Sequence, residues 1–295
     1  MFRGVSLEDS VRHRQFVESV TRGGQSAEGK YAKLAFTMPS DVTLSLEGRV
    51  ALITGGSRGI GAATVRLFVR AGARVVFNYL QAKSEAENLV AECGTHVCHA
   101  MQADLTGTAN TELLVKATIN RFGALDILVG NHGIWPPENV AIDAMFDEQW
   151  HKTIAVNLDS IFGLVKHTVA QIKRQQRGRH IVLVSSTAGQ RGEAGHADYA
   201  AAKGALISMV KGLSTELAPF RIHVNCVAPG WVHTDMSGDA LEDPQCGREI
   251  FATIPLARVG TPEEIAGPIL FLCTRYAGFV TGEIFNVNGG AVLAG

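Results

Sequence analysis

The feature that most constrains the fold is a glycine-rich turn between two apolar segments. Residues 49–53 have the composition of a buried parallel strand, and residues 62–71 carry apolar side chains at helical spacing. Between them lies Thr54-Gly55-Gly56-Ser57-Arg58-Gly59-Ile60-Gly61, whose glycines permit a tight turn. The N-terminus of the following helix offers free N–H groups to a pyrophosphate. A strand, a glycine turn and a helix in this order predict a dinucleotide-binding unit, with an ordinary glycine-rich turn as the alternative.

Beyond Leu46 the chain repeats this alternation of strand and helix. In a chain of 295 residues, 46% of them hydrophobic, the pattern predicts one large α/β core. We expect a single Rossmann-type doubly wound parallel sheet of about seven strands, with helices on both faces, over residues 46–295. Loops at the carboxyl ends of the strands should then converge on one crevice. The expected strands are 49–54, 74–79, 96–101, 125–130, 179–185, 221–227 and 283–287, and the expected helices are 60–71, 82–93, 108–122, 143–150, 153–176, 198–217 and 262–273.

Three polar residues in the second half of the chain predict proton transfer. Tyr199 and Lys203 are four residues apart in a helical segment, so they share one helix face. A neighbouring ammonium lowers the pKa of a phenol, about 10 in water, toward the working range. Ser186 offers a hydroxyl that can hold a substrate oxygen while the proton moves. A solvated helix pair would look the same in isolation, but the glycine motif upstream favours the catalytic interpretation.

In this order the motifs resemble those of the short-chain dehydrogenase/reductase family, from about Leu46 to Gly295. The resemblance implies general acid/base catalysis by Tyr199 and stabilisation of the substrate oxygen by Ser186. It implies that Lys203 lowers the tyrosine pKa and contacts the nicotinamide ribose. It also implies that Asn157 holds a water that relays protons, although a buried amide bonded to backbone is the alternative. The implied catalytic residues are therefore Asn157, Ser186, Tyr199 and Lys203.

The resemblance also implies an NAD(P) site, and the end of the second predicted strand bears on the cofactor. It reads Asn78-Tyr79-Leu80, without the acid that would bind the ribose 2′-hydroxyl of NAD. Arg58 could pair with the 2′-phosphate of NADP, and Asn78 could donate a further hydrogen bond. We therefore expect NADP(H) to be preferred, with NAD(H) possible. The expected cofactor-binding residues are Gly55, Ser57, Arg58, Gly59, Ile60, Gly61, Asn78, Tyr79, Asp104, Leu105, Asn131, Gly133, Tyr199, Lys203, Pro229, Gly230, Val232 and Thr234.

Two positions near this site, 104 and 132, each have two possible roles. Asp104 resembles the family's adenine contact, but an Asp that caps a helix fits equally well. In Gly130-Asn131-His132-Gly133 the family usually has Asn-Asn-Ala-Gly, so a histidine replaces a small alanine. We favour an imidazole that is turned to solvent or stacked locally. The alternative is a donor aimed at the cofactor ribose or its phosphate.

The activity that the resemblance implies is NADPH-dependent reduction of a ketone to a secondary alcohol. The chain resembles the 3-oxoacyl-acyl-carrier-protein reductase branch of the family at residues 199–204, 227–230, 255–260 and 287–290. One expected substrate is therefore a 3-oxoacyl thioester, either free or bound to acyl carrier protein. Trp135 and Trp231 should flank the cleft mouth. The alternatives are a dehydrogenase or reductase of another small ketone, sugar or steroid, and a dinucleotide-binding sensor without turnover. A basic surface for the acyl carrier would draw on Lys173, Arg174, Arg177, Arg179 and Arg191.

Composition excludes several other classes. A formal net charge of −1 gives no reason to expect nucleic acid or an anionic membrane as partner. Apolar runs fall short of the roughly 20 residues that span a bilayer. The five cysteines show no metal-ligand clustering, and we expect no metal site and reduced thiols in a cytoplasmic protein.

Three further segments carry expectations. Residues 1–45 read as a flexible N-terminal extension, and Met38, like Met1, could be the true start. Residues 236–253 are long and polar for a connection, which predicts a mobile lid over substrate. The family resemblance implies a homotetramer formed through the helices at 153–176 and 198–217.

Overall fold

The sheet follows from buried strands whose side chains alternate between two cores. In the computed structural model, which describes residues 43–176 and 179–293, Val50 and Leu52 of β1 (Val50–Ile53) face one core while Ala51 and Ile53 face the other. The other strands are β2 (Arg74–Tyr79), β3 (Cys98–Gln102), β4 (Ile127–Gly130), β5 (His180–Val184), β6 (His223–Pro229) and β7 (Ile284–Val287). All seven predicted strands are present, with ends displaced by at most two residues.

The strands form one parallel sheet in the order β3-β2-β1-β4-β5-β6-β7. The chain runs outward from β1 to β3 and then returns to place β4 on the other side of β1. This reversal puts the ligand crevice at the carboxyl ends of β1 and β4. The predicted doubly wound α/β fold is confirmed.

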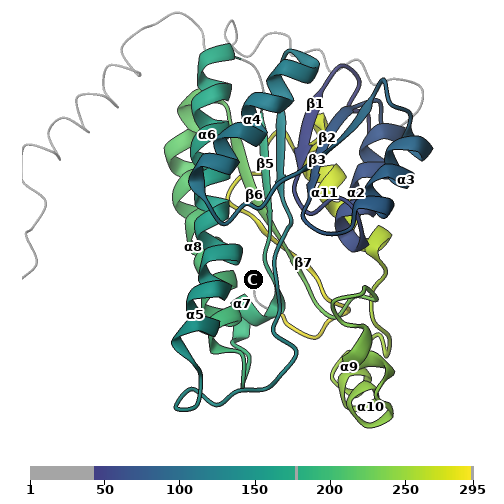
Figure 1. Ribbon diagram of the computed structural model, residues 1–295, viewed down its shortest axis with the longest axis vertical. Coiled ribbons are helices and arrows are strands. Elements are labelled where there is room, and N and C mark those ends of the chain that lie inside the picture. The colour runs from purple at the N-terminus through teal and green to yellow at the C-terminus, as the bar shows by residue number, and fades with distance from the viewer. Residues whose placement is uncertain (1–42, 177–178, 294–295) are drawn as a thin grey trace, which may run out of the picture. The chain divides into compact units, whose positions relative to one another are not determined.

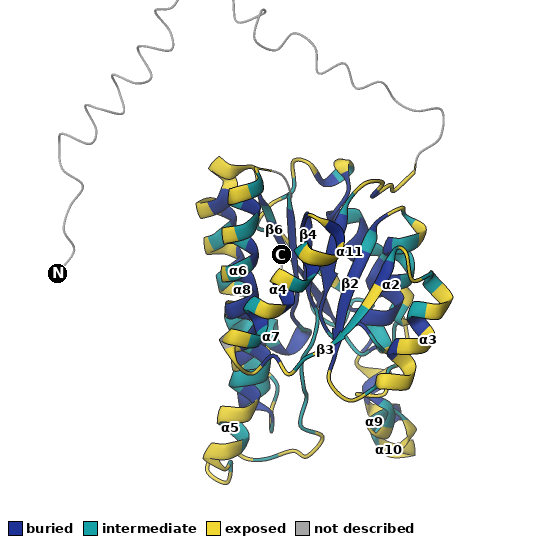
Figure 2. Cartoon of the chain, turned by 45° about the horizontal axis from the view of Figure 1, so that its top comes forward, coloured by how far each residue is buried: buried dark blue, intermediate teal, exposed yellow. Residues whose placement is uncertain are grey.

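Helices cover both faces of the sheet (Figure 1). One face packs against α2 (Gly59–Arg70), α3 (Lys83–Cys93) and α11 (Pro262–Leu272), through apolar residues such as Phe68, Leu89 and Ile269. The other packs against α4 (Thr108–Phe122), α6 (Ser160–Gln175) and α8 (Ala197–Leu217), through residues such as Leu114 and Leu164. Figure 2 shows the consequence: the central strands are buried, and the helices are exposed on their outer faces.

Four details differ from the prediction. The helix expected over 143–150 is α5 (Asp147–Ile154), and it continues without a break through a π-helical turn, η2 (Ala155–Asp159), into α6. Short helices α7 (Thr187–Arg191), α9 (Gly238–Glu242) and α10 (Pro244–Ala252) were not expected. The predicted lid is therefore largely helical. Pro244 starts α10, where the Asp243 carboxylate accepts hydrogen bonds from the N–H groups of residues 245 and 246.

The remaining short elements are the 3₁₀ turns η3 (Ala218–Phe220) and η4 (Arg275–Ala277). Among the described residues, no helix is long and apolar enough to cross a membrane. The extension predicted over residues 1–45, including both candidate start methionines, lies outside the described residues except for positions 43–45.

Candidate active site

A cleft of about 640 Å³ opens at the carboxyl ends of the strands, where the reversal in strand order predicts it. The loops after β1, β2, β3, β4, β5 and β6 all contribute to its lining. Every predicted site residue lines it except Gly61 and Asn157, which lie behind its wall. The arrangement expected from the loop motifs is therefore present in the structure.

The glycine turn fits the pyrophosphate of a dinucleotide. Gly55 and Gly59 adopt φ values of +63° and +53°, which side chains rarely allow. A Cβ at Gly61 would lie 2.0 Å from the carbonyl oxygen of Gly55, so the first turn of α2 packs directly on the glycine loop. Arg58 occupies the N-cap of α2 and makes no capping hydrogen bond with its own side chain. The N-terminus of α2 thus presents backbone N–H groups and a positive dipole end to the cleft.

Two asparagines hold the glycine turn in place. The Asn78 side chain accepts a hydrogen bond from Gly55 N at 2.9 Å and donates one to Ala103 O at 3.0 Å. Asn131 Nδ2 donates to the carbonyl oxygens of Thr54 and Gly55 at 3.0 and 3.3 Å. The Asn78 amide thus links the glycine loop to the loop after β3, and a further donation from its Nδ2 to a 2′-phosphate stays a prediction.

Arg58 and Asp104 both face the cleft. An Arg58 Nη1 atom lies 3.4 Å from the Asp235 carboxylate, and both side chains are well exposed, so the pair is weak and leaves the guanidinium available. The Asp104 carboxylate accepts hydrogen bonds from Thr106 N and Thr106 Oγ1, which lower its pKa. It shapes the turn before α4 rather than capping the helix, whose N-cap is Gly107.

His132 occupies neither of the two predicted settings. Its Nδ1 lies 2.8 Å from Thr54 Oγ1, and its Nε2 lies 2.7 Å from Ser160 Oγ. Ser160 Oγ donates its own proton to Val156 O at 2.7 Å, so it accepts from Nε2–H and leaves Nδ1 to accept from Thr54. The imidazole therefore bridges the end of β1 to the start of α6, and it is directed neither to solvent nor to a ligand. Burial, reinforced by the charge of Lys203, lowers its pKa to about 3.

We expect His132→Ala to weaken cofactor binding about tenfold, because the glycine loop loses its tie to α6. The substitution should also reduce acid sensitivity. A histidine with a lowered folded-state pKa costs stability as pH falls from about 6.5 toward 3, since only the unfolded chain takes up that proton. Cofactor titration and thermal unfolding at pH 5 and pH 7.5 test both effects. A variant whose melting temperature falls between these pH values as much as wild type would contradict the assignment.

Asn157 lies within the π-helical turn and is fully buried. Its Oδ1 accepts from Ile134 N and its Nδ2 donates to Ile134 O, both at 2.8 Å. The structure thus bears out the alternative of a buried amide bonded to backbone. A Cβ at Gly133 would lie 2.7 Å from Asn157 Oδ1 and 3.4 Å from Lys203 Nζ, so Asn157 positions the loop after β4 where it faces the lysine.

The three remaining catalytic candidates meet on one wall of the cleft. The Ser186 side chain lies next to the Tyr199 hydroxyl and acts to lower its pKa. Ser186 Oγ, at the N-cap of α7, also accepts from Ala188 N at 3.1 Å. Lys203 Nζ lies 5.7 Å from the centre of the Tyr199 ring and donates to Val184 O at 2.9 Å. A half-buried phenol and hydroxyl beside a buried amine can hold a carbonyl oxygen and move a proton to it.

The pKa of Tyr199 is raised in this structure, whereas the sequence predicted a lowered value. Burial raises the pKa of Tyr199 to about 12, the Ser186 hydrogen bond opposes that rise, and the negative charge of Glu193 adds to it. Burial lowers the pKa of Lys203 to about 8. The physical reason is that both groups lose water, while Lys203 Nζ bonds to Val184 O instead of the phenol.

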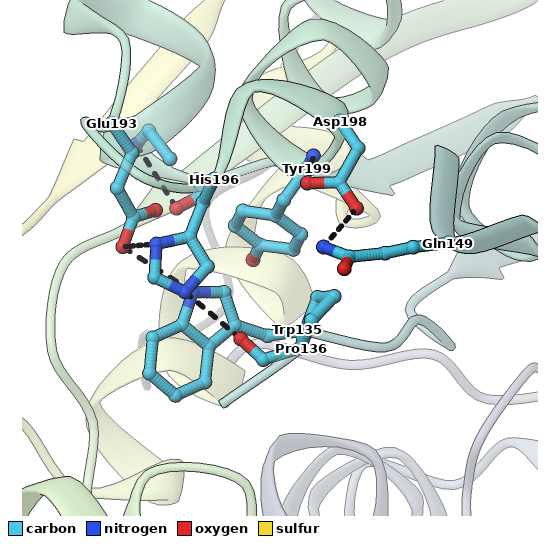
Figure 3. Close-up of polar contacts among 9 residues, drawn as sticks. Trp135, Pro136, Gln149, Glu193, His196, Asp198 and Tyr199 are labelled. Carbon is cyan, nitrogen blue, oxygen red and sulfur yellow. Dashed lines mark hydrogen bonds and ion pairs between the residues drawn. The ribbon is translucent and has the colours of Figure 1, made fainter. Parts of the chain in front are cut away.

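Sequence reasoning missed a second wall of the cleft, shown in Figure 3. Trp135 stacks on His196, with ring centroids 4.8 Å apart, and meets Trp231 edge-on at 5.8 Å. Trp135 Nε1 donates to Glu193 Oε1 at 3.3 Å. The predicted placement of the two tryptophans beside the cleft is confirmed, since both line it. Glu193 and His196 lie between Ser186 and Tyr199 in the sequence, and this location was the signal that could have identified them as site residues.

The start of α8 is fixed from α5. The buried Asp198 carboxylate accepts hydrogen bonds from Thr153 Oγ1 at 2.8 Å and from Gln149 Nε2 at 3.2 Å. It also accepts from Tyr199 N at 2.8 Å. Ser185 Oγ donates to Lys203 O at 2.7 Å. These contacts place Tyr199 and Lys203 at the cleft. Within the described part of the chain, no group of three or more His, Cys, Asp or Glu side chains could hold a metal ion.

The comparisons with known proteins agree with this geometry. A family model described as enoyl-(acyl carrier protein) reductase matches residues 55–292. A 3-oxoacyl-[acyl-carrier-protein] reductase from Synechocystis is 38% identical over 84% of this chain and 99% of its own length. A protein of the same description from Vibrio cholerae is 39% identical over 85% of this chain and 100% of its own.

Solved structures give the same result. A glucose/ribitol dehydrogenase of the short-chain dehydrogenase/reductase type from Brucella melitensis superimposes with a TM-score of 0.79, at 36% identity, over 86% of this chain and all of its own. A 3-ketoacyl-(acyl-carrier-protein) reductase from the same organism, in complex with NADH, gives 0.78 at 30% identity, over 84% of this chain and all of its own.

Proposed function

Since this chain belongs to the short-chain dehydrogenase/reductase family, and is an NAD(P)-dependent oxidoreductase acting on CH–OH and C=O groups, we propose that it reduces a 3-oxoacyl thioester to the 3-hydroxyacyl thioester with NADPH. The observation that carries the proposal is the wall on which Ser186, Tyr199 and Lys203 meet. The substrate class follows the relatives, several of which are 3-oxoacyl-[acyl-carrier-protein] reductases.

The side chains have distinct proposed roles. Ser186 and Tyr199 hold the carbonyl oxygen between their hydroxyl groups, and Ser186 stabilises the charge that grows there. Bound NADPH would supply the hydride to the carbonyl carbon. Tyr199 gives its proton to the oxygen. With a pKa near 12 the phenol is protonated at neutral pH, which suits reduction because that direction needs a proton donor.

The dinucleotide would lie along the lining loops. The N-terminus of α2 and the glycine turn would hold the pyrophosphate, and the loop after β6, at 229–234, would cover the nicotinamide. Lys203 would hold the nicotinamide ribose. Arg58 would pair with the 2′-phosphate, which supports NADPH over NADH because no carboxylate lies at the end of β2 to compete for the ribose.

We expect Arg58→Ala to raise the KM for NADPH about tenfold while changing the KM for NADH by less than about twofold. The guanidinium is more than half exposed and lines the cleft, so its loss should leave the fold intact. Arg70→Ala, at the exposed end of the same helix, is the matched control. Equal losses with both cofactors would refute the assignment of Arg58 to the phosphate.

Substrate profiling tests the proposed reaction. Acetoacetyl thioesters of coenzyme A and of acyl carrier protein should give the highest kcat/KM with NADPH, above sugars, steroids and simple ketones. Arg191 lines the cleft and could meet an acidic carrier there. A sugar as best substrate would support the alternative that the glucose/ribitol dehydrogenase neighbour raises. Cofactor binding without turnover of any carbonyl would favour a sensor.

The family resemblance also supports a homotetramer built through α6 and α8. Phe162 on α6 is 53% exposed, which is unusual for so large an apolar side chain unless another surface covers it. Mass measurement in solution tests this part of the proposal. A monomer at micromolar concentration would exclude it.

A further inference from the structure

One carboxylate on the substrate side of the cleft is held in a fixed position. The Glu193 side chain is 19% exposed, and its Oε1 accepts a hydrogen bond from Trp135 Nε1 at 3.3 Å. The same oxygen lies 3.7 Å from Nδ1 of His196. Figure 3 shows the carboxylate at the polar edges of the stacked indole and imidazole, beside Tyr199.

The partners of Glu193 are themselves immobilised. His196 is 2% exposed, and its Nε2 donates to Pro136 O at 2.9 Å. Its ring stacks on Trp135 at an interplanar angle of 17°. Trp135 in turn meets Trp231 edge-on. The carboxylate is therefore a rigid part of the wall, and it does not have the freedom of a solvated surface side chain to swing away from a ligand.

The charge of Glu193 acts where the chemistry takes place. It adds to the pKa of the Tyr199 hydroxyl, after the larger effect of burial. Three exposed cations also line the cleft, Arg58, Lys152 and Arg191, and water and salt screen them more strongly than a carboxylate held against the wall. Lys203 Nζ is bonded to Val184 O. A ligand bound against Tyr199 therefore meets the negative charge of Glu193 in addition to the positive charge of Lys203.

We propose that Glu193 is a specificity-determining residue that disfavours substrates with a negative charge next to the reacting carbonyl, so that neutral 3-oxo esters and thioesters are selected over free 3-oxo acids. This inference rests on the proposed function. A carboxylate substrate would have to place its charge within the field of Glu193 while its ketone lies against Ser186 and Tyr199. An ester of the same shape carries no such charge and avoids the repulsion.

The experiment compares acetoacetate with ethyl acetoacetate, both with NADPH, in wild type and Glu193→Gln. Glutamine keeps an oxygen that can accept from Trp135 Nε1 but removes the charge. We expect the ratio of kcat/KM for acetoacetate to kcat/KM for the ester to rise about tenfold in the variant, because an effect through Tyr199 acts on both compounds and cancels in the ratio. Glu216→Gln, which removes an exposed carboxylate on α8 away from the cleft, is the control and should leave both values unchanged.

Two binding-level readouts keep this inference separate from the proposed reaction. Tryptophan fluorescence, sensitive to Trp135 and Trp231, gives the Kd of each compound, and Glu193→Gln should tighten acetoacetate about tenfold. NMR of ring-labelled tyrosine, assigned with Tyr199→Phe, should show a lower pKa of Tyr199 in Glu193→Gln.

The outcomes distinguish the two claims. If wild type reduces neither compound but the acetoacetate Kd falls as expected, the charge role stands and the proposed reaction fails. If the ester is reduced while the preference for ester over acid is the same in wild type and Glu193→Gln, the role of Glu193 is overturned. That conclusion holds even if the pKa of Tyr199 falls in the variant.

Discussion

Tyr199→Phe is expected to lower kcat at least about 10³-fold while the Kd of the cofactor stays within about twofold of wild type. The phenol is the proton donor in the proposed mechanism, and a proton in place at the developing alkoxide contributes about 10²- to 10⁴-fold. The ring itself is kept, so packing of α8 should not change. Turnover of an acetoacetyl thioester and cofactor fluorescence titration are the two measurements.

Tyr276→Phe is the matched control, because it removes a phenol hydroxyl in η4, away from the cleft. It should show wild-type kcat. Ser186→Ala should fall between the two, since Tyr199 can still deliver its proton without the second hydrogen bond to the substrate oxygen. Turnover of Tyr199→Phe at a rate close to wild type would remove the proposed mechanism.

Gly61→Ala should raise the Kd of the cofactor at least about a hundredfold. The added Cβ would lie 2.0 Å from Gly55 O and 2.8 Å from Asn131 Nδ2, so both the turn and its asparagine tie must move. Because backbone is the obstacle, no rotation of a side chain relieves the contact. Fluorescence titration measures the affinity, and circular dichroism with thermal unfolding shows whether the rest of the sheet remains folded.

Gly212→Ala is the control for adding a methyl group to a helical glycine. A Cβ there would meet nothing within 4 Å, so the variant should bind the cofactor normally and gain up to about 1 kcal/mol of stability from helix propensity. If Gly61→Ala binds the cofactor as wild type does, the glycine turn is not the pyrophosphate site. If it unfolds, Gly59→Ala tests the same loop: its added Cβ would meet only the Thr234 side chain, at 3.2 Å, so its main cost is the backbone strain of a side chain at a φ of +53°.

The sheet could be predicted from sequence because its strands are short apolar runs buried on both faces, such as Val50–Ile53. The π-helical turn could not. Residues 155–159 have no local signal for it, and it exists because Asn157 pairs with both polar groups of Ile134 from a different part of the chain. The break expected near residue 151 was wrong for the same reason, since tertiary contacts keep α5 and α6 continuous.

The candidate site likewise has parts that could be predicted from sequence and parts that could not. Ser186, Tyr199 and Lys203 could be placed together, because their strand and helix positions bring them to one edge of the sheet. The hydrogen bonds of Asn78 and His132 could not be predicted, since each side chain bonds to a segment far away in sequence. The direction of the Tyr199 pKa depended on burial and on Glu193, which the spacing of Tyr199 and Lys203 does not reveal.

Four polar side chains at the floor of the cleft or directly behind it are already hydrogen-bonded to the protein: Asn78, Asn131, His132 and Asn157. These side chains join loops that follow different strands. Replacing one of them therefore leaves its hydrogen-bond partners in other loops without a bond. Arg58 and Glu193 lie at the rim, where Arg58 makes only a weak exposed pair with Asp235 and the bond of Glu193 to Trp135 can be kept by glutamine. An engineer who wants a different coenzyme or substrate should therefore change residues at the rim and keep those at the floor. In natural divergence of such enzymes, too, substitutions at the rim should be tolerated better than substitutions at the floor.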